Sequence, residues 1–247
     1  MRPTLLLLHG FPHDRTLWDI NTVALNKAAD VVTVDLLGFG TNRTNAHVNT
    51  MEELAHDVHR TISERGLHRI VLCGLSMGGY VAMAFIERWP YLAQGLILCN
   101  TRSAADNEEA KAAREATAVD ATEKGMAVIA RGMLPKVLCA ITRREKPEVV
   151  AQMEALMSRQ DPKGVAAASR GMAQRPDRTH VLKGFNVPSL VITGAEDELM
   201  PLPTSQAMVD ALPRAELVVL PAAGHLSNVE APDAFNAAVL NYLRALE

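Results

Sequence analysis

Residues 74–78, Gly-Leu-Ser-Met-Gly, join a strand-like segment to a helix-like segment. An apolar run typical of a buried strand, residues 69–73, comes directly before them, and a helical apolar pattern, residues 79–86, follows. The glycines on either side of Ser76 permit a sharp turn, because glycine has no Cβ atom to clash there. The hydroxyl group is then held out from the sheet at the start of a helix, where negative charge is favoured. We therefore predict that Ser76 is a nucleophile.

Five more apolar runs of strand length alternate with helix-like segments along the chain. The run at residues 4–8 is typical of a strand that is buried on both faces, as in a parallel sheet. The five runs span residues 4–8, 30–35, 94–99, 189–193 and 216–220. Strands that alternate with helices indicate right-handed crossovers and a doubly wound sheet. We therefore predict an α/β fold with a mostly parallel sheet of about six strands.

The helix-like segments of this pattern carry their own start and stop signals. Thr50 and Glu53 have the spacing of a capping box, and Gly66 ends the same helix. Helices are predicted over residues 16–28, 50–65, 202–212 and 232–246.

Residues 103–182 interrupt the alternation of strands and helices. The segment is rich in Ala, Glu, Arg and Met at helical spacing, which predicts roughly three to five helices and no strand. We interpret it as a helical cap, inserted after the fourth strand of a core made of residues 1–102 and 183–247. Ligands bind at the carboxyl ends of the strands in such sheets, so a cap placed there would cover the site. Helix breaks are expected at Gly125, Pro135, Pro147, Pro162 and Pro176.

Two further residues with catalytic side chains also follow predicted strands. Asp197 ends the sequence Gly-Ala-Glu-Asp after the fifth strand, and His225 lies in Ala-Gly-His-Leu after the sixth. Because the carboxyl ends of parallel strands face one edge of the sheet, we expect both side chains to meet Ser76. His225 would take the proton of Ser76, and Asp197 would orient the ring and stabilise the imidazolium. Glu196 and Glu198 flank Asp197 and are the alternative acids.

The oxyanion that forms during such a reaction needs two N–H donors. We expect one from the backbone of Met77, the residue after the nucleophile, and one from the backbone of Phe11, in the His-Gly-Phe-Pro loop after the first strand. His9 is expected to shape this loop rather than to react. His13 and Asp14 either face the site or, as we expect, lie in a solvated part of the loop.

These motifs together resemble those of the α/β-hydrolase fold family with an inserted helical cap. The matching segments are residues 9–12, 35–40, 74–79, 194–197 and 224–225. Within the family, the chain is most similar to small esterases, enol-lactonases and cofactor-free haloperoxidase-like enzymes; residues 131–136 and 175–178 of the cap resemble the enol-lactonase branch. The resemblance favours Asp197 as the acid and implies hydrolysis of an ester, lactone, amide or related bond, with no metal and no organic cofactor.

The sequence departs from the family pattern in two places. The family usually has a pair of strands before the strand at residues 4–8, and the chain begins at Met1, so we expect six strands and an altered sheet edge. The loop after Asp35 has Leu37 and Thr41 where the family often has a basic residue and a serine. This second difference should change the packing of the loop and leave the catalytic residues in place.

The composition of the chain argues against several kinds of binding partner. The formal net charge of −3 gives no electrostatic basis for binding nucleic acid or an anionic membrane, and no apolar run is long enough to span a bilayer. The three cysteines, Cys73, Cys99 and Cys139, lack the spacing of a metal site. This small, odd number of cysteines and the lack of a leader-like segment favour a cytoplasmic protein whose thiols are reduced. We expect Cys73 and Cys99 to be buried thiols.

The sequence therefore predicts a serine hydrolase that cleaves a small carboxylic ester or lactone through an acyl-enzyme. Two alternatives use the same three residues: a cofactor-free perhydrolase or haloperoxidase, and a carbon–carbon bond hydrolase. A third alternative, from a different class, is a ligand receptor on a hydrolase scaffold. Arg102, at the start of the cap, either meets a substrate carboxylate or, as we expect, forms a salt bridge at the hinge.

Overall fold

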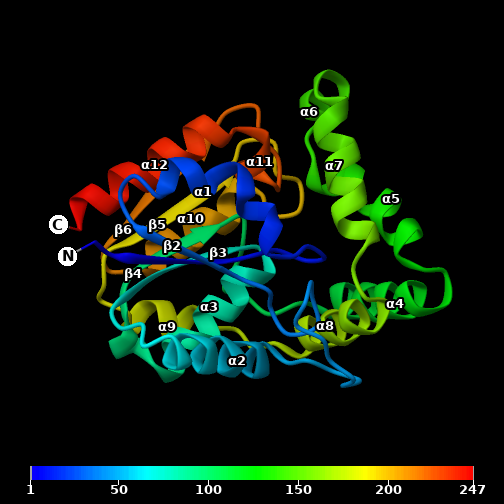
Figure 1. The fold of residues 1–247 in the computed structure, drawn as a ribbon, viewed down its shortest axis with the longest axis horizontal. Helices are drawn as coiled ribbons and strands as arrows, with labels where there is room; N and C mark the ends of the chain where they lie inside the picture. Colours follow the sequence, from blue (N-terminus) through cyan, green and yellow to red (C-terminus); the bar gives the residue numbers. More distant parts are fainter. Residues whose placement is uncertain (1, 247) are drawn as a thin grey trace.

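The computed structural model describes residues 2–246. Its centre is a parallel sheet of six strands in the order β2-β1-β3-β4-β5-β6 (Figure 1). The predicted α/β fold and its six strands are confirmed, and β3 and β5 extend one or two residues further because Gly74 and Gly194 join the ladders. The strands are β1 (Thr4–Leu8), β2 (Asp30–Val34), β3 (Ile70–Leu75), β4 (Ala93–Cys99), β5 (Ser189–Gly194) and β6 (Ala215–Leu220).

Helices flank both faces of the sheet (Figure 1). They are α1 (Asp19–Leu25), α2 (Met51–Glu64), α3 (Met77–Arg88), α9 (Thr179–Gly184), α10 (Leu202–Ala211), α11 (Ser227–Glu230) and α12 (Pro232–Ala245), with the 3-10 turns η1 (Arg15–Trp18) and η2 (Pro90–Leu92). The first helix is shorter than predicted, because its opening turn is η1 and it ends at Leu25. The short helix α11 was not predicted.

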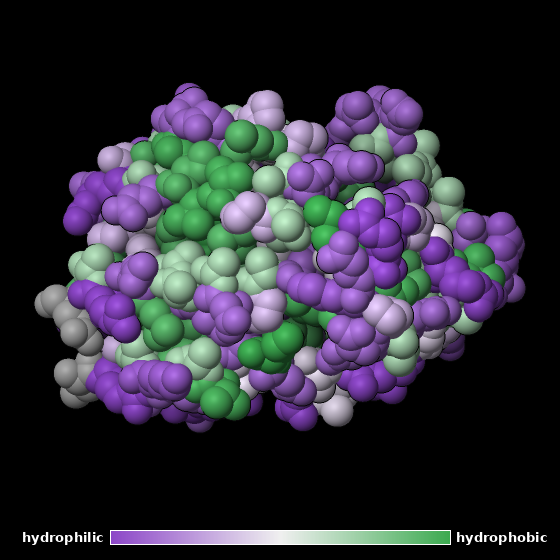
Figure 2. Space-filling model, turned by 90° about the horizontal axis from the view of Figure 1, so that it is seen from above, coloured by the Kyte–Doolittle hydropathy of each residue, from purple (hydrophilic) through white to green (hydrophobic). Residues whose placement is uncertain are grey.

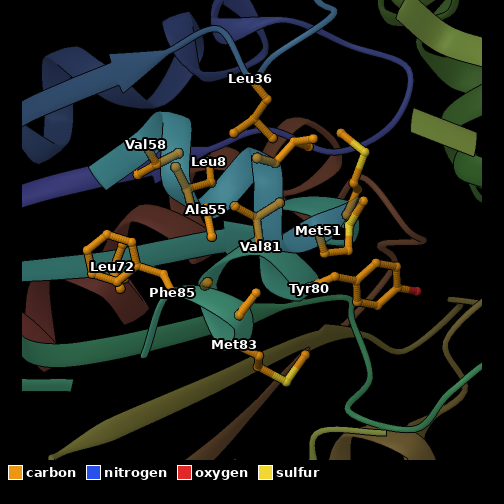
Figure 3. Close-up of a cluster of buried hydrophobic side chains, with 14 of the residues drawn as sticks. Leu8, Leu36, Met51, Ala55, Val58, Leu72, Tyr80, Val81, Met83 and Phe85 are labelled. Atoms are coloured by element: carbon orange, nitrogen blue, oxygen red, sulfur yellow. The ribbon is translucent and has the colours of Figure 1, made fainter. Parts of the chain in front are cut away.

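β1 shows how a strand of this sheet is buried on both faces. Leu5 and Leu7 pack in a cluster with residues of α1 and α12, whereas Leu6 and Leu8 pack in a second cluster with residues of α2 and α3. Figure 3 shows the second cluster, in which side chains from β1, β3, α2 and α3 point toward one another. Each fully buried leucine contributes roughly 1.5–3 kcal/mol to stability, so both faces of the strand hold the fold together.

The start of α2 has the predicted capping box. The hydroxyl oxygen of Thr50 accepts from the N–H of Glu53 at 3.2 Å, and the N–H of Thr50 donates to Glu53 Oε2 at 2.7 Å. Gly66 follows the helix with a φ of +63°, a conformation that glycine adopts without strain.

The chain between β4 and β5 forms helices, and residues 103–182 contain no strand. Five of these helices, α4 to α8, lie beyond the carboxyl ends of the strands (Figure 1). α9 instead contacts α3 and α10 beside the sheet. The domain boundaries at residues 102/103 and 182/183 stay predictions. The cap helices are α4 (Glu108–Glu123), α5 (Met126–Val137), α6 (Ala140–Glu145), α7 (Pro147–Ser158) and α8 (Pro162–Gln174).

One of the predicted helix breaks in this segment is wrong. Pro135 lies inside α5, which continues to Val137. Proline removes one backbone donor from a helix, and here the loss falls in the last turn, just before the helix ends. Gly125 does precede α5, and Pro147 and Pro162 begin α7 and α8 as predicted.

Helix α8 docks on the loops after β2 through backbone contacts. A Cβ atom built on Gly164 would lie 1.8 Å from the carbonyl oxygen of Gly38, and one built on Gly171 would lie 1.7 Å from that of Asn49. The N–H of Asn49 donates to the carbonyl oxygen of Ala167 at 3.0 Å. The two glycines therefore allow the cap to approach the core at backbone distance.

The surface over α1 and α12 mixes polar residues with a hydrophobic area (Figure 2). Ile20 and Val23 of α1 are among the large apolar side chains that are exposed. Every helix within residues 2–246 is too short or too polar to cross a lipid bilayer.

Candidate active site

Ser76 lies in a strained turn between β3 and α3. Its φ of +53° and ψ of −113° are angles that residues other than glycine rarely adopt. The N–H of Ser76 donates to the carbonyl oxygen of Cys99 at 2.9 Å, and its own carbonyl oxygen accepts from the hydroxyl of Thr101 at 2.8 Å. The end of β4 therefore helps to hold the turn.

The glycines of this turn are required by close backbone contacts. A Cβ atom on Gly74 would lie 2.3 Å from the carbonyl oxygen of Gly78, and one on Gly78 would lie 2.1 Å from the carbonyl oxygen of Leu8. Real Cβ atoms do not approach oxygen so closely, so any other residue would force the backbone to move. This confirms the clash that the sequence pattern predicts.

Gly78→Ala is therefore expected to lower the free energy of unfolding by about 3 kcal/mol or more, since the clashing atoms belong to the backbone of β1. Gly132 in α5 gives a matched control, because no atom beyond its neighbours and the backbone of its own helix lies within 4 Å of the position that a Cβ atom would take there. Gly132→Ala should instead stabilise the protein by about 0.5–1 kcal/mol, through helix propensity. Urea unfolding of both variants measures the contrast, and equal effects would contradict it.

The structure brings the three predicted catalytic side chains together at the carboxyl ends of β3, β5 and β6. His225 Nε2 lies 2.8 Å from Ser76 Oγ. His225 Nδ1 lies 2.9 Å from Asp197 Oδ2 and 3.1 Å from Oδ1. Glu196 and Glu198, the alternative acids, are exposed. The arrangement is the one that a nucleophile, a base and an orienting acid require.

Asp197 is fully buried and accepts hydrogen bonds from several donors. Asn100 Nδ2 donates to its Oδ2 at 2.8 Å, and the N–H groups of Leu199 and Met200 each donate to its Oδ1 at 3.0 Å. Burial alone would raise the pKa of Asp197, but the His225 ring and these donors outweigh it and lower the pKa below its ordinary value. The carboxylate is therefore ionised at neutral pH.

Asn100 is a residue of the site that the sequence reasoning missed. It directly follows β4, is fully buried and has a φ of +47°. Besides Asp197, its Nδ2 donates to the carbonyl oxygen of Gly224 at 3.1 Å, and its Oδ1 accepts from the hydroxyl of Ser227 at 2.5 Å. The available signal was an asparagine at the carboxyl end of a buried strand, a residue type that tolerates positive φ.

The two predicted oxyanion donors, Phe11 and Met77, belong to segments that adjoin the nucleophile. Met77 begins α3, where the first N–H groups have no partner within the helix. The loop that carries Phe11 is adjacent, because a Cβ atom on Gly10 would lie 3.4 Å from Ser76 Cβ. Within residues 2–246, neither the N–H of Phe11 nor that of Met77 donates to a backbone carbonyl.

His9 joins the loop after β1 to the loop after β2, as expected of a residue that shapes the site. Its Nε2 accepts from the N–H of Leu36 at 3.0 Å, and its Nδ1 lies 2.9 Å from the carbonyl oxygen of Gly10. Burial lowers the pKa of His9. The ring is therefore neutral and serves as a bridge between the two loops.

The expectation that His13 and Asp14 lie in a solvated loop is wrong. His13 is fully buried, and this burial lowers its pKa to about 3. Asp14 is covered by the cap segment that follows α7: Arg159 Nη2 and Gln160 Nε2 each donate to its Oδ2 at 2.8 Å. Gln160 Oε1 also accepts from the N–H of Gly40 at 3.0 Å. The cap thereby binds the loops after both β1 and β2.

The pH dependence of stability should report this contact between cap and core. Although burial by itself raises the pKa of Asp14, hydrogen bonds from Thr16, Gln160 and Arg159 lower it from an ordinary value of 3.8 to about 2. The ionised carboxylate therefore stabilises the fold above about pH 4, and this contribution is lost as the pH falls toward 2.

Asp14→Asn is expected to lower the free energy of unfolding by about 1–2 kcal/mol at neutral pH, with a difference from the wild type that shrinks below about pH 4. Urea unfolding of both proteins at neutral pH and at several lower pH values measures it. A difference that does not change with pH would contradict the assignment of the stabilisation to this carboxylate.

Arg102 forms the hinge salt bridge that we expected. It pairs with Asp106, whose carboxylate is fully buried and also lies 3.2 Å from Arg114 Nε and 2.9 Å from Arg175 Nη1. Arg175 follows α8, so the cluster ties the beginning of the cap to its end.

The three cysteines are buried and unpaired by disulfides in the described chain. The sulfur atoms of Cys73 and Cys99 lie 3.8 Å apart on neighbouring strands, and burial raises the pKa of the Cys99 thiol. The predicted burial of Cys73 and Cys99 is confirmed.

Comparison with known proteins agrees with the fold. The profile of the alpha/beta hydrolase family matches residues 5–238. The 3-oxoadipate enol-lactonase 2 of Acinetobacter baylyi is 26% identical over 238 residues, which are 96% of this chain and 87% of that protein.

Solved structures of two enzymes superpose on almost the whole chain. A thermophilic esterase from Thermogutta terrifontis is 40% identical with a TM-score of 0.96, over 99% of this chain and 90% of that one. The enol-lactonase from Burkholderia xenovorans LB400 is 29% identical with a TM-score of 0.92, over 99% of this chain and 92% of that one.

Proposed function

The chain belongs to the alpha/beta hydrolase family, and we propose that it hydrolyses a small carboxylic ester or lactone through an acyl-enzyme. The observation that carries the proposal is the hydrogen-bonded chain from Ser76 Oγ to His225 Nε2, at 2.8 Å, and from His225 Nδ1 to Asp197 Oδ2, at 2.9 Å. The names of the similar enzymes, an esterase and two enol-lactonases, support the class of bond.

In the first half of the reaction, Ser76 Oγ attacks the carbonyl carbon of the substrate while His225 Nε2 takes the hydroxyl proton. Asp197 keeps the other ring proton on Nδ1 and stabilises the imidazolium. The tetrahedral oxyanion accepts hydrogen bonds from the N–H groups of Phe11 and Met77. The imidazolium then protonates the leaving alkoxide oxygen, and the acyl group remains on Ser76.

In the second half of the reaction, His225 removes a proton from water as its oxygen attacks the acyl carbon. The proton returns to Ser76 Oγ when the carbon–oxygen bond to the enzyme breaks, and the carboxylic acid is released. An ester and a lactone follow the same steps. Because the steps are the same, one site serves both substrates. The two substrates differ only in the alcohol group, which leaves as a separate molecule from an ester and stays attached to the acid product of a lactone.

A burst assay with p-nitrophenyl esters of increasing acyl length tests the proposal. We expect p-nitrophenolate to be released in an amount equal to the enzyme before steady turnover, and the length profile to measure the acyl pocket. A p-nitrophenyl phosphonate is expected to transfer one phosphonyl group to Ser76. The enzyme should hydrolyse this adduct only slowly, so mass spectrometry would detect it. An absence of both labelling and turnover, on esters and on lactones, would contradict the proposal.

Separate assays distinguish the alternative functions. Cleavage of a diketone without ester hydrolysis would indicate a carbon–carbon bond hydrolase. Oxidation of halide by peroxide that depends on acetate would indicate a perhydrolase. Binding of esters without any turnover would indicate a receptor.

A further inference from the structure

The backbone on both sides of His225 is bound to other segments of the chain. The N–H of Leu226, directly after His225, donates to the carbonyl oxygen of Val137 in the cap at 3.1 Å. The carbonyl oxygen of Gly224, directly before His225, accepts from Asn100 Nδ2 at 3.1 Å. The position of the imidazole ring therefore depends on the cap as well as on the sheet.

Glu230 links the same two segments through its carboxylate. Its Oε1 accepts from the N–H of Gly224 at 2.8 Å, and its Oε2 accepts from the N–H of Cys139 at 2.8 Å. The residue is only 2% exposed. Lys146 Nζ also donates to Glu230 at 2.7 Å, but to its backbone carbonyl oxygen. Each carboxylate oxygen thus serves a backbone donor, one beside His225 and one in the cap.

The packing around Gly224 shows how tightly the two segments meet. A Cβ atom on Gly224 would lie 2.8 Å from the backbone nitrogen of Cys139 and 2.9 Å from Glu230 Oε1. Glycine therefore lets the cap backbone and the carboxylate reach the His225 segment directly. A side chain here would separate them.

The short helix α11 connects this contact to the acid as well. Glu230 is its last residue, and Ser227, its first, donates its hydroxyl to Asn100 Oδ1 at 2.5 Å. Asn100 in turn donates to Asp197 Oδ2 at 2.8 Å. One end of α11 thus supports the acid, and the other end supports the segment that carries the base.

We propose that Glu230 is a positioning residue for His225. It joins the His225 segment to residues 137–139 of the cap, and so keeps His225 Nε2 within hydrogen-bonding distance of Ser76 while this part of the cap is in place. The inference rests on the proposed function, because it assigns Glu230 to the reaction in which His225 is the base.

The carboxylate is the chemical feature that this role requires. A glutamine has one acceptor oxygen and one donor NH2 group. In either orientation, its NH2 group would face the N–H of Gly224 or that of Cys139. Glu230→Gln therefore removes one hydrogen bond and opposes two donors, while the size of the side chain hardly changes.

The experiment compares the wild type with Glu230→Gln and with Asp106→Asn. Asp106 is the matched control, since it is another buried carboxylate of the cap and its charged partners are Arg102, Arg114 and Arg175, none of which belongs to the His225 segment. Below the melting temperature of every variant, we would measure kcat and KM for a p-nitrophenyl ester and the downfield proton resonance of His225 Nδ1–H. The thermal midpoint of each variant is measured separately.

For Glu230→Gln, we expect kcat to fall about 10- to 100-fold with little change in KM, because the base is misplaced rather than removed. We also expect the His225 resonance to shift or broaden. Asp106→Asn should lower the thermal midpoint and leave kcat and the resonance unchanged. Loss of thermal stability alone in Glu230→Gln, without a change in kcat or in the resonance, would overturn the proposal.

Two further outcomes are informative. Lys146→Met removes a second link between the cap and Glu230, the hydrogen bond to the backbone carbonyl oxygen of Glu230. This variant replaces Glu230→Gln if that variant does not fold. A smaller fall in kcat with a shifted resonance supports the proposal, and an unchanged kcat and resonance overturn it. If Glu230→Gln alters the resonance while the wild type hydrolyses no ester or lactone, the positioning role stands and the proposed function fails.

Discussion

Ser76→Ala is expected to lower kcat/KM for ester hydrolysis by about 10⁴-fold or more, and to abolish the burst of p-nitrophenolate. The change removes only the oxygen that lies 2.8 Å from His225 Nε2. The turn should keep its shape, because its hydrogen bonds to Cys99 and Thr101 involve the backbone of Ser76. The variant can still bind the substrate and stabilise an oxyanion, but it has no nucleophile to form the acyl-enzyme.

Ser205 provides the matched control for this prediction. It is a fully buried serine of α10, and its hydroxyl has no hydrogen-bond partner in the described chain. Ser205→Ala is therefore expected to keep full activity and to be no less stable than the wild type. Full esterase activity in Ser76→Ala would remove Ser76 from the mechanism, whatever the behaviour of Ser205→Ala.

The parts of the fold that could be predicted from sequence have causes that act locally. β1 carries four successive leucines because Leu5 and Leu7 face one layer of helices while Leu6 and Leu8 face the other. The convergence of the candidate catalytic residues follows from the same sheet, since parallel strands end at one edge. Gly74 was predictable because its close backbone contact, with Gly78, lies within the same turn.

The burial of the loop after β1 could not be predicted, because it is caused by a distant segment. Asp14 and Gln160 are 146 positions apart in the chain, and nothing in the local pattern around Asp14 indicates that the cap will cover it. Glu230 and Cys139 are likewise 91 positions apart, and their hydrogen bond uses a backbone N–H that carries no sequence signal. The supporting residues of the candidate site were missed for this reason.

Asp197 is held in an environment that suits a carboxylate and no other side chain. Its Oδ1 accepts from the N–H groups of Leu199 and Met200, and its Oδ2 accepts from Asn100 Nδ2. An asparagine at this position would point its NH2 group either at the two backbone N–H groups or at Asn100 Nδ2, all of which are donors themselves. Asn100 cannot rotate its amide to compensate, because its Nδ2 also donates to Gly224 and its Oδ1 accepts from Ser227.

The less costly orientation of the new amide keeps its oxygen on the two backbone donors and points its NH2 group at Asn100 and at His225 Nδ1. The ring must then accept at Nδ1 and carry its proton on Nε2, which faces Ser76. A protonated Nε2 cannot take the hydroxyl proton of the nucleophile. Asp197→Asn should therefore fail as a catalyst even where it folds with its backbone unchanged.

Asp197→Asn is accordingly expected to lower kcat about 10³- to 10⁴-fold at neutral pH, and to lower the thermal midpoint through its opposed donors. Steady-state kinetics with a p-nitrophenyl ester measures the first effect, and calorimetry the second. Glu196→Gln and Glu198→Gln, at the exposed flanking positions, should keep wild-type activity.

The effects of substitutions within one catalytic unit are not additive. The double variant of Ser76→Ala with Asp197→Asn should therefore be scarcely slower than Ser76→Ala alone. Multiplication of the two losses would show that Asp197 acts independently of Ser76 and would contradict its role as the orienting acid.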